Sequence, residues 1–138
     1  MVPDCAFCLI AAGQAPAHTV LDEADAVAML DTRPLFPGHV LVIPRAHHAT
    51  LTEVPSELVA PLFTAVQRVA GAVRAAMVAD GTFVAVNNTV SQSVPHLHVH
   101  VVPRRFKDGL RGFFWPRRRY GDEAEMAQVA GAIRRFLT

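Results

Sequence analysis

The sequence Pro-His-Leu-His-Val-His-Val-Val-Pro at residues 95–103 alternates imidazole and aliphatic side chains between two prolines. On a helix, residues two positions apart point in different directions, so the middle histidine would leave the group. On a strand, the three histidines share one face and the aliphatic residues share the other. The prolines also disfavour a helix through this stretch. We therefore expect a strand from Val94 to Val102 with one buried apolar face.

The three histidines of this stretch, His96, His98 and His100, cannot all bind one metal ion from a straight strand. The outer pair would lie about 13 Å apart at Cα, whereas zinc ligands lie about 2 Å from the ion. At least one histidine must therefore have another role. A solvated surface stripe is the alternative interpretation, which the adjoining apolar residues disfavour.

The rest of the chain contains further short β-prone segments and two helical ones. Expected strands are residues 19–22, 26–30, 39–43 and 82–87, in addition to 94–102. Apolar residues recur at helical spacing from Ser56, with a stop signal at Asp80-Gly81. A second amphipathic helix begins at Asp122, and its apolar residues are expected to face inward: Met126, Val129, Ala130, Ile133 and Leu137. This order predicts an α+β fold with an antiparallel sheet.

Composition sets limits on the class of protein. The chain has 138 residues, 51% of them apolar and 18% charged, with a net charge of +1. These values predict one ordered globular domain without a general affinity for nucleic acid or membranes. The sequence shows neither a signal peptide pattern nor an apolar run long enough to span a membrane, so we expect a cytoplasmic protein. The closely spaced Cys5 and Cys8 favour metal or redox chemistry over a disulfide framework.

Four segments together resemble the histidine triad (HIT) superfamily. They are Gln92 to Arg104 with its His-x-His-x-His core, Cys5-Ala-Phe-Cys8, Leu30-Asp31 followed by Pro37-Gly-His-Val-Leu-Val-Ile-Pro44, and Asn87-Asn88. The resemblance implies a single HIT domain over 1–138, with a core at about 5–104 and a basic, aromatic loop and helix at 105–138. It also implies an antiparallel five-stranded sheet, a long central helix and a C-terminal helix. Such protomers dimerise to a ten-stranded sheet.

The resemblance also assigns catalytic roles. His98 is the expected nucleophile, whose neutral imidazole attacks the α-phosphate of a nucleotide. His100 should contact the phosphate oxygens, and the remaining catalytic positions are His96 and Gln92. A third histidine favours the hydrolase branches, because the sugar-phosphate uridylyltransferases carry glutamine there.

Nucleotide binding is assigned in the same way. Asp31 matches the residue that binds the ribose hydroxyls, and His39 matches a residue that steadies the triad from behind without contacting the substrate. The remaining nucleotide contacts that the resemblance implies are Asn87, Asn88, Gln92 and Ser93, together with His98 and His100. The stretch from Asn88 to Gln92 departs from the family pattern because it is shorter and carries no glycine.

Zinc is the expected cofactor. The N-terminal cysteine pair resembles that of several HIT proteins that have a structural Cys2His2 site. The resemblance implies that this site would here consist of Cys5, Cys8, His47 and His96. His48 is an alternative to His47 because the two are adjacent. Four protein ligands leave no open position for catalysis.

The expected function is hydrolysis or nucleotidyl transfer at the α-phosphate of adenosine nucleotides through a nucleotidyl-histidine intermediate. Candidate substrates are phosphoramidates, adenylates and dinucleoside polyphosphates. One alternative is a zinc-stabilised nucleotide-binding scaffold with residual activity. Another is aprataxin-like removal of adenylate from nucleic acid, which the absence of an appended DNA-binding domain disfavours. The basic, aromatic stretch at 104–119 contains Trp115-Pro116, which is similar to a pair in Hint-type proteins, and is expected to be a substrate-side loop or dimer contact.

Overall fold

Two units, Met1–Asp108 and Gly109–Thr138, make up the chain in the computed structural model, which describes residues 1–111 and 117–137. The first unit holds two α-helices, one short 3-10 helix and five strands. In chain order these are α1 (Ala6–Ala11), β1 (Thr19–Asp22), β2 (Ala26–Leu30), β3 (Val40–Pro44), η1 (Leu51–Glu53), α2 (Ser56–Ala76), β4 (Gly81–Val86) and β5 (Val99–Arg104). The second unit holds α3 (Glu123–Phe136).

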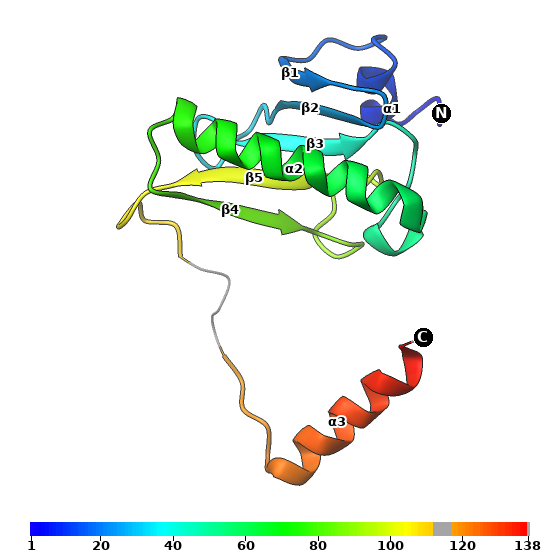
Figure 1. Ribbon diagram of the computed structural model, residues 1–138, viewed down its shortest axis with the longest axis vertical. Helices are drawn as coiled ribbons and strands as arrows, with labels where there is room; N and C mark the ends of the chain where they lie inside the picture. The colour runs from blue at the N-terminus through cyan, green and yellow to red at the C-terminus, as the bar shows by residue number, and fades with distance from the viewer. Residues whose placement is uncertain (112–116, 138) are drawn as a thin grey trace. The chain divides into compact units, whose positions relative to one another are not determined.

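The five strands form one antiparallel sheet in the order β1-β2-β3-β5-β4 (Figure 1). The last strand along the chain, β5, therefore lies between β3 and β4. Its register sets His100 opposite Leu41 on β3 and opposite Ala85 on β4. The expected α+β class with a five-stranded antiparallel sheet is confirmed, and the strand that contains His100 has a partner on each side.

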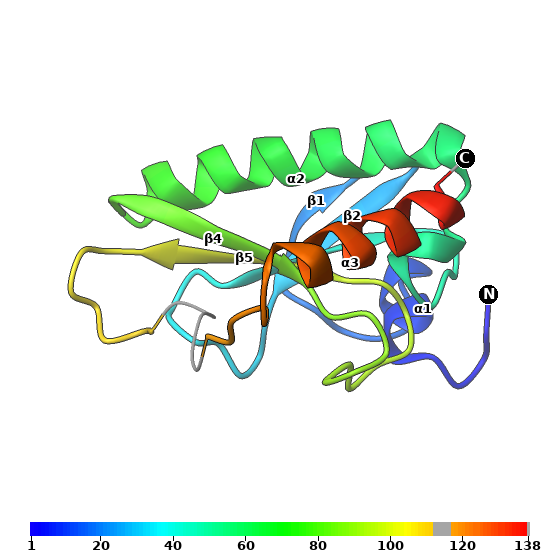
Figure 2. The ribbon, with the colours of Figure 1, turned by 90° about the horizontal axis from the view of Figure 1, so that it is seen from below.

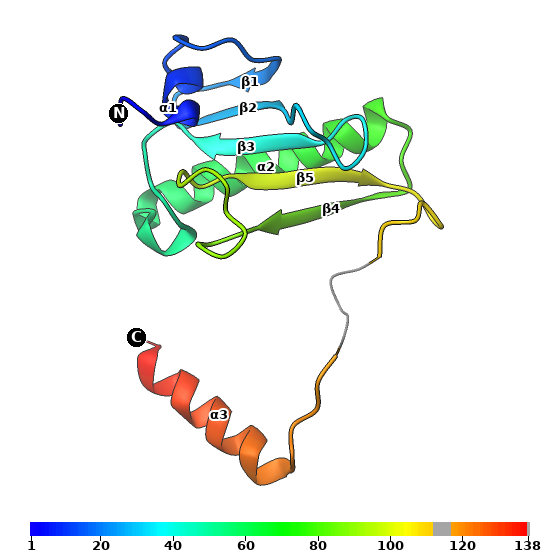
Figure 3. The same cartoon turned by 180° about the vertical axis from the view of Figure 1, so that it is seen from behind.

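The alternation of side chains along the strands gives the sheet two covered faces. On one face, Ala28, Val42 and Val99 pack with α2 in the larger apolar cluster. On the other, Met29 and Ile43 pack with α1 in a second cluster that also contains Cys5 and Cys8. Figure 2 shows α2 and α1 on opposite sides of the strands, and Figure 3 shows the face that α1 partly covers. Because β3 contributes to both clusters, all five of its residues are buried.

The long helix α2 forms because its apolar residues recur on one side. Its buried residues are Leu62, Ala65, Val66, Val69 and Val73. Burying a side chain of Val or Leu size contributes roughly 1.5–3 kcal/mol, so this apolar side accounts for the attachment of α2 to the sheet. The helix ends at Ala76, before the expected stop at Asp80-Gly81, and Gly81 already begins β4.

The expected strand from Val94 to Val102 is wrong at its beginning. Pairing starts only at Val99 and continues to Arg104. Before it, the backbone N–H of His96 donates to Val94 and that of Leu97 donates to His48, so this segment bonds outside the strand ladder. Pro95 cannot donate a ladder hydrogen bond at all. The side-chain alternation nevertheless holds, because Leu97 and Val99 join the α2 cluster.

Helix α3 confirms the expected C-terminal helix. The side chain of Asp122 accepts a hydrogen bond from the backbone N–H of Glu125 and caps the first turn. Arg134 and Arg135 lie in the last turn, where the helix dipole favours positive charge. Within the second unit taken by itself, no residue of α3 is buried, so the expected inward face of this helix stays a prediction. Among the described residues, none of the helices has the length and apolar character that crossing a membrane requires.

Val78, directly after the end of α2, adopts a left-handed backbone conformation with φ of 51°. Such a conformation costs an L-residue about 1–2 kcal/mol, and β-branched residues are strained there. The Val78 side chain is 82% exposed, so it gains little from packing in return. We predict that Val78→Asn raises the free energy of unfolding by about 1 kcal/mol, since asparagine tolerates this region. Denaturant unfolding measures the change.

The matched control for this substitution is Val59→Asn, on the half-exposed side of α2. Valine and asparagine have similar helix propensities, so its effect should lie within about 0.5 kcal/mol of zero. Equal changes at the two positions would show that backbone strain at Val78 is not the cause.

Candidate active site and metal cluster

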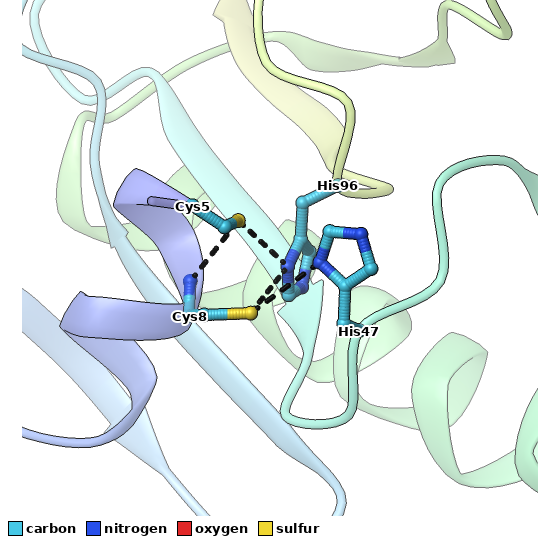
Figure 4. A group of neighbouring side chains, drawn as sticks. All are labelled: Cys5, Cys8, His47 and His96. Atoms are coloured by element: carbon cyan, nitrogen blue, oxygen red, sulfur yellow. Dashed lines mark hydrogen bonds between the residues drawn. The ribbon is translucent and has the colours of Figure 1, made fainter. Parts of the chain in front are cut away.

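Two cysteines and two histidines converge where α1 meets the segment before β5. Cys5 and Cys8 come from the start of α1, His47 follows β3, and His96 precedes β5 (Figure 4). The Nδ1 atom of His96 lies 3.5 Å from the Cys5 sulfur and 3.6 Å from the Cys8 sulfur. The Cys8 sulfur lies 3.3 Å from Nδ1 of His47, and all four ligand atoms lie within 4.8 Å of one another.

The donor set fits a tetrahedral ion. Ligand atoms at about 2.0–2.3 Å from one zinc ion lie roughly 3.5 Å from each other, which matches the sulfur–nitrogen distances in the cluster. The Nε2 atom of His96 lies 2.8 Å from the carbonyl oxygen of Pro44. A carbonyl only accepts, so Nε2 carries the proton and Nδ1 presents its lone pair to the sulfurs. His96 is therefore held in the tautomer that a metal ligand requires.

The choice between adjacent histidines at 47 and 48 follows from this geometry. His47 belongs to the cluster, whereas the ring Nε2 of His48 is buried with no hydrogen-bond partner in the part of the chain that the structure describes. Burial raises the pKa of the Cys5 thiol. A bound cation would counteract this effect, because thiolates are the form that binds metal.

The imidazole of His98 is oriented by the backbone of His96. Its Nδ1 lies 2.8 Å from the His96 carbonyl oxygen, so Nδ1 donates and Nε2 is left with a free lone pair in the neutral ring. The ring of Phe7 packs against it edge to face, with the ring centroids 5.1 Å apart. His98 is only 5% exposed. The side chain is thus fixed with one nitrogen bonded and the other available for chemistry.

A chain of hydrogen bonds sets the tautomers of His39 and His100. The backbone N–H of Leu35 donates to Nδ1 of His39 at 3.0 Å, so the neutral ring carries its proton on Nε2. That Nε2 lies 3.0 Å from Nδ1 of His100 and donates to it. The neutral ring of His100 must then carry its own proton on Nε2. His100 therefore presents a donor beside His98, with the two ring centroids 5.0 Å apart.

Burial keeps both of these rings neutral. It lowers the pKa of His39, although the nearby carboxylate of Asp31 opposes the shift. Burial, with His98 and His39 as neighbours, lowers the pKa of His100 to about 4. Asp31, His39 and His100 also lie close enough to hold a cation, but the facing nitrogens of the two histidines already bond each other.

His98 and His100 line a pocket of about 670 Å³, a volume typical of small-molecule sites. Two of the other expected nucleotide contacts, Asp31 and Ser93, also line it. The complete lining is Phe7, Ile10, Pro16, Ala17, His18, Met29, Leu30, Asp31, Thr32, Arg33, Leu41, Ser93, Val94, His98 and His100. Most of the wall is apolar. Its polar residues are His18, Asp31, Thr32, Arg33, Ser93, His98 and His100. A smaller hollow of about 410 Å³ between α2 and the strands has apolar walls and Arg68, which pairs with Glu23.

Gln92, Asn87 and Asn88 are not among the residues that line this pocket. The Gln92 side chain accepts from the backbone N–H of Thr89 and donates to the carbonyl of Ala49 at 2.6 Å. The Asn88 side chain accepts from the backbone N–H of Leu51 at 2.8 Å. Both side chains therefore tie the 87–93 loop to the segment after His47.

The absence of glycine in this loop has a visible consequence. Thr89 and Ser91 adopt positive φ values of 70° and 61°, the region that glycine normally occupies. The loop therefore reaches its shape at a cost in backbone strain, and the Gln92 and Asn88 hydrogen bonds help to offset it.

Sequence reasoning missed the apolar wall of the pocket. Phe7 lies between the two cysteines, and Ile10 lies one helical turn further along α1. The only available signal was that a short helix starting at Cys5 would point residues at this spacing to one side. Trp115-Pro116 and the neighbouring aromatic residues 113 and 114 lie outside the described residues.

This chain is similar to known proteins in both sequence and fold. It is 43% identical over 108 residues to an uncharacterized HIT-like protein of Mycobacterium tuberculosis, covering 77% of this chain and 75% of the relative. It is 34% identical over 137 residues to Adenylylsulfatase HINT3 of Arabidopsis thaliana, covering 97% of this chain and 70% of the relative.

Among structures, SMU.412c of Streptococcus mutans matches with a TM-score of 0.90 at 34% identity, over 98% of this chain and 86% of that one. A Zn-bound histidine triad family protein from Mycobacterium smegmatis matches with a TM-score of 0.73 at 38% identity, over 94% and 97%.

The low pKa of His100 predicts a pH-dependent stability. Between pH 6.5 and about 4, the unfolded chain binds a proton at this position that the native protein does not. The contribution of His100 to the free energy of unfolding is therefore fully present above pH 6.5 and declines as the pH falls toward 4. We predict that His100→Gln reduces this decline, so that the unfolding free energy of the wild type falls relative to that of the variant as the pH is lowered from 6.5 to about 4. Urea unfolding at a series of pH values tests this, and parallel curves for the two proteins would contradict it.

The sequence match to the HIT domain spans residues 12–107, from the end of α1 to beyond β5. It includes all five strands and the segment that carries the three histidines. With this match, the relatives and the shared fold, the chain belongs to the histidine triad family.

Proposed function

We propose that the protein hydrolyses adenosine nucleotides at the α-phosphate, with His98 as the nucleophile. The observation that supports this most directly is the free Nε2 lone pair of His98 inside the 670 Å³ pocket, with the Nε2–H of His100 beside it. The name of the Arabidopsis relative, an adenylylsulfatase, agrees with chemistry at an adenylyl group.

The reaction has two displacements. Nε2 of His98 attacks the α-phosphorus, a bond forms between nitrogen and phosphorus, and the leaving group departs with the electron pair of its bond. The imidazole becomes positively charged, and the hydrogen bond from Nδ1 to the His96 carbonyl stabilises that charge. Water then attacks the same phosphorus and gives up a proton to solvent, while the nitrogen–phosphorus bond breaks with its electron pair returning to Nε2, which releases AMP and restores the neutral ring.

His100 has the proton arrangement of an electrostatic stabiliser. Its lowered pKa keeps it from competing as a second cation, and its Nε2–H can donate to a phosphate oxygen. His39 acts through His100, because it fixes the tautomer that makes this donor available. His39 is therefore a positioning residue.

The pocket offers separate regions for the rest of the nucleotide. One carboxylate oxygen of Asp31 accepts from the backbone N–H of Arg33 at 2.8 Å, which fixes the side chain at the pocket wall. A fixed acceptor suits the ribose hydroxyls. The apolar side chains of Phe7, Ile10 and Leu41 suit the faces of a base. Ser93 is available for the phosphates or the leaving group.

We also propose that zinc occupies the Cys2His2 cluster of Cys5, Cys8, His47 and His96. The fit of the donor distances and the zinc-bound relative from Mycobacterium smegmatis support it. With four protein ligands, the ion supplies cross-linking of α1 to the segment before β5 rather than catalysis. Homodimerisation to a ten-stranded sheet is part of the same proposal, and the sheet would extend through one of its two edge strands, β1 or β4.

Substitution of the nucleophile gives a direct test. We predict that His98→Ala lowers kcat for adenosine 5′-phosphoramidate and adenylyl sulfate by at least about a thousandfold, because no covalent intermediate can form. AMP binding, measured by calorimetry, should persist. Turnover is measured as AMP release by chromatography.

His18→Ala is the matched control, because His18 is another histidine of the pocket wall but is exposed and belongs to neither hydrogen-bond chain. It should retain kcat within about tenfold. If wild type bound AMP but hydrolysed both substrates no faster than His98→Ala, the protein would be a nucleotide-binding module instead of a hydrolase.

For the metal, we predict one zinc ion per chain in the purified protein, measured by mass spectrometry of the digested sample. Cys8→Ser should lower the zinc content and the Tm, because removal of one ligand weakens a tetrahedral site and with it the folding free energy. His48→Gln should keep full zinc content, since His48 lies outside the cluster. Full zinc content in Cys8→Ser, or its loss in His48→Gln, would contradict the assignment.

A further inference from the structure

The metal cluster and the nucleophile share one residue, His96. Its side chain supplies Nδ1 to the cluster, and its backbone carbonyl accepts the hydrogen bond that fixes His98. The other ring nitrogen of His96 is anchored to Pro44 at the end of β3. A displacement of the His96 ring would therefore move the carbonyl on which the tautomer of His98 depends.

The segment after His47 makes a second connection. It forms three hydrogen bonds to residues 88–97, each made by a residue within four positions of His47. The hydrogen bonds run from Leu97 N–H to the His48 carbonyl at 2.7 Å, from the Gln92 side chain to the Ala49 carbonyl at 2.6 Å, and from Leu51 N–H to the Asn88 side chain at 2.8 Å. Because this loop holds two residues with strained backbone, it depends on such external bonds.

The third connection is Phe7, which lies between the two cysteines in α1. Its ring contacts His96 and His98 edge to face, at centroid distances of 5.9 Å and 5.1 Å. The cysteines thus fix the helix that presses Phe7 against the nucleophile. All three connections start from a segment that carries metal ligands and end at His98 or its loop.

We propose that metal binding at the Cys2His2 cluster positions the nucleophile and the 87–97 segment, so that the metal and the nucleotide bind cooperatively. This inference rests on the proposed function, which makes the pocket a nucleotide site. Its tests measure amide exchange, the His98 tautomer and binding affinity, none of which requires turnover. The coupling acts through Phe7, the His96 carbonyl and the hydrogen bonds of residues 48–51. Thermodynamic linkage then requires that AMP raise the affinity for zinc by the factor by which zinc raises the affinity for AMP.

The first test compares zinc-loaded and chelator-treated full-length protein by NMR. We expect the loss of zinc to accelerate solvent exchange of the Leu97 and Leu51 amides at least about tenfold more than that of the α2 amides of Val69 and Val73. We also expect the His98 ring to change from a single Nδ1–H tautomer to a mixture. Unchanged exchange and tautomer would overturn the proposal. Equal acceleration in α2 would also overturn it, because the metal would then support the whole fold instead of this segment.

The second test is calorimetry with zinc and AMP as the two ligands. We expect zinc to tighten AMP binding by about tenfold, within the usual range of coupling between sites, and AMP to tighten zinc binding by the same factor. Independent affinities would overturn the proposal. A failure of the protein to release AMP from any substrate would count against the proposed hydrolase function while leaving both of these measurements able to decide the coupling.

Matched variants separate coupling from loss of stability. Cys8→Ser removes a ligand, whereas Val69→Ala removes buried apolar contact on the α2 face of the sheet, outside the cluster that contains the cysteines. Compared at temperatures equally far below their Tm values, Val69→Ala should keep the wild-type dependence of AMP affinity on zinc, and Cys8→Ser should lose it. An equal loss in both variants would show that general destabilisation, and not the metal, weakens AMP binding.

Discussion

The hydrogen bond from Nδ1 of His98 to the carbonyl oxygen of His96 is the interaction on which the rest of the site depends. It fixes the ring of His98 and decides which of its nitrogens can react. The carbonyl itself is held because His96 is anchored through both ring nitrogens, by Pro44 on one side and by the cysteine sulfurs on the other. The orientation of the His98 ring therefore depends on the position of the His96 side chain.

The sheet explains how the three histidines acquire different environments. His100 lies within β5 and faces the pocket, where its neighbour is His39. His98 lies just before the strand, and His96 lies further ahead of it, where its ring contacts Phe7 of α1. A continuous strand would place the three imidazoles alike on one face. The interruption before Val99 instead gives one ring beside the cysteine sulfurs, one ring with a free nitrogen and one ring that presents a donor.

Much of the fold could be predicted from sequence because the strands obey a simple period. The buried run at Val40–Pro44 and the amphipathic α2 follow from apolar spacing alone. The start of β5 could not be predicted, because the segment before it is held by the carbonyl of His48, a residue that is distant in sequence. For α3, apolar spacing defines a face of the helix but does not identify what covers it.

For the site, the histidine spacing and the family resemblance identified the four residues of the metal cluster and most polar groups of the pocket. Local patterns did not reveal the roles that need three-dimensional neighbours. Phe7 looked like an ordinary residue between two cysteines, and Gln92 gave no sign that both ends of its amide would bond to the backbone. The tautomer of His100 likewise depends on Leu35, four residues before His39 in a separate loop.

The mechanism that we propose depends on a covalent bond between His98 and the α-phosphorus. The most direct test is the stereochemical course of hydrolysis of an adenosine 5′-phosphorothioate substrate that is chiral at phosphorus, carried out in oxygen-18 water. Two successive displacements each invert the phosphorus centre, so the account predicts overall retention of configuration. Overall inversion would mean that water attacks the substrate directly, and it would contradict the assignment of His98 as the nucleophile.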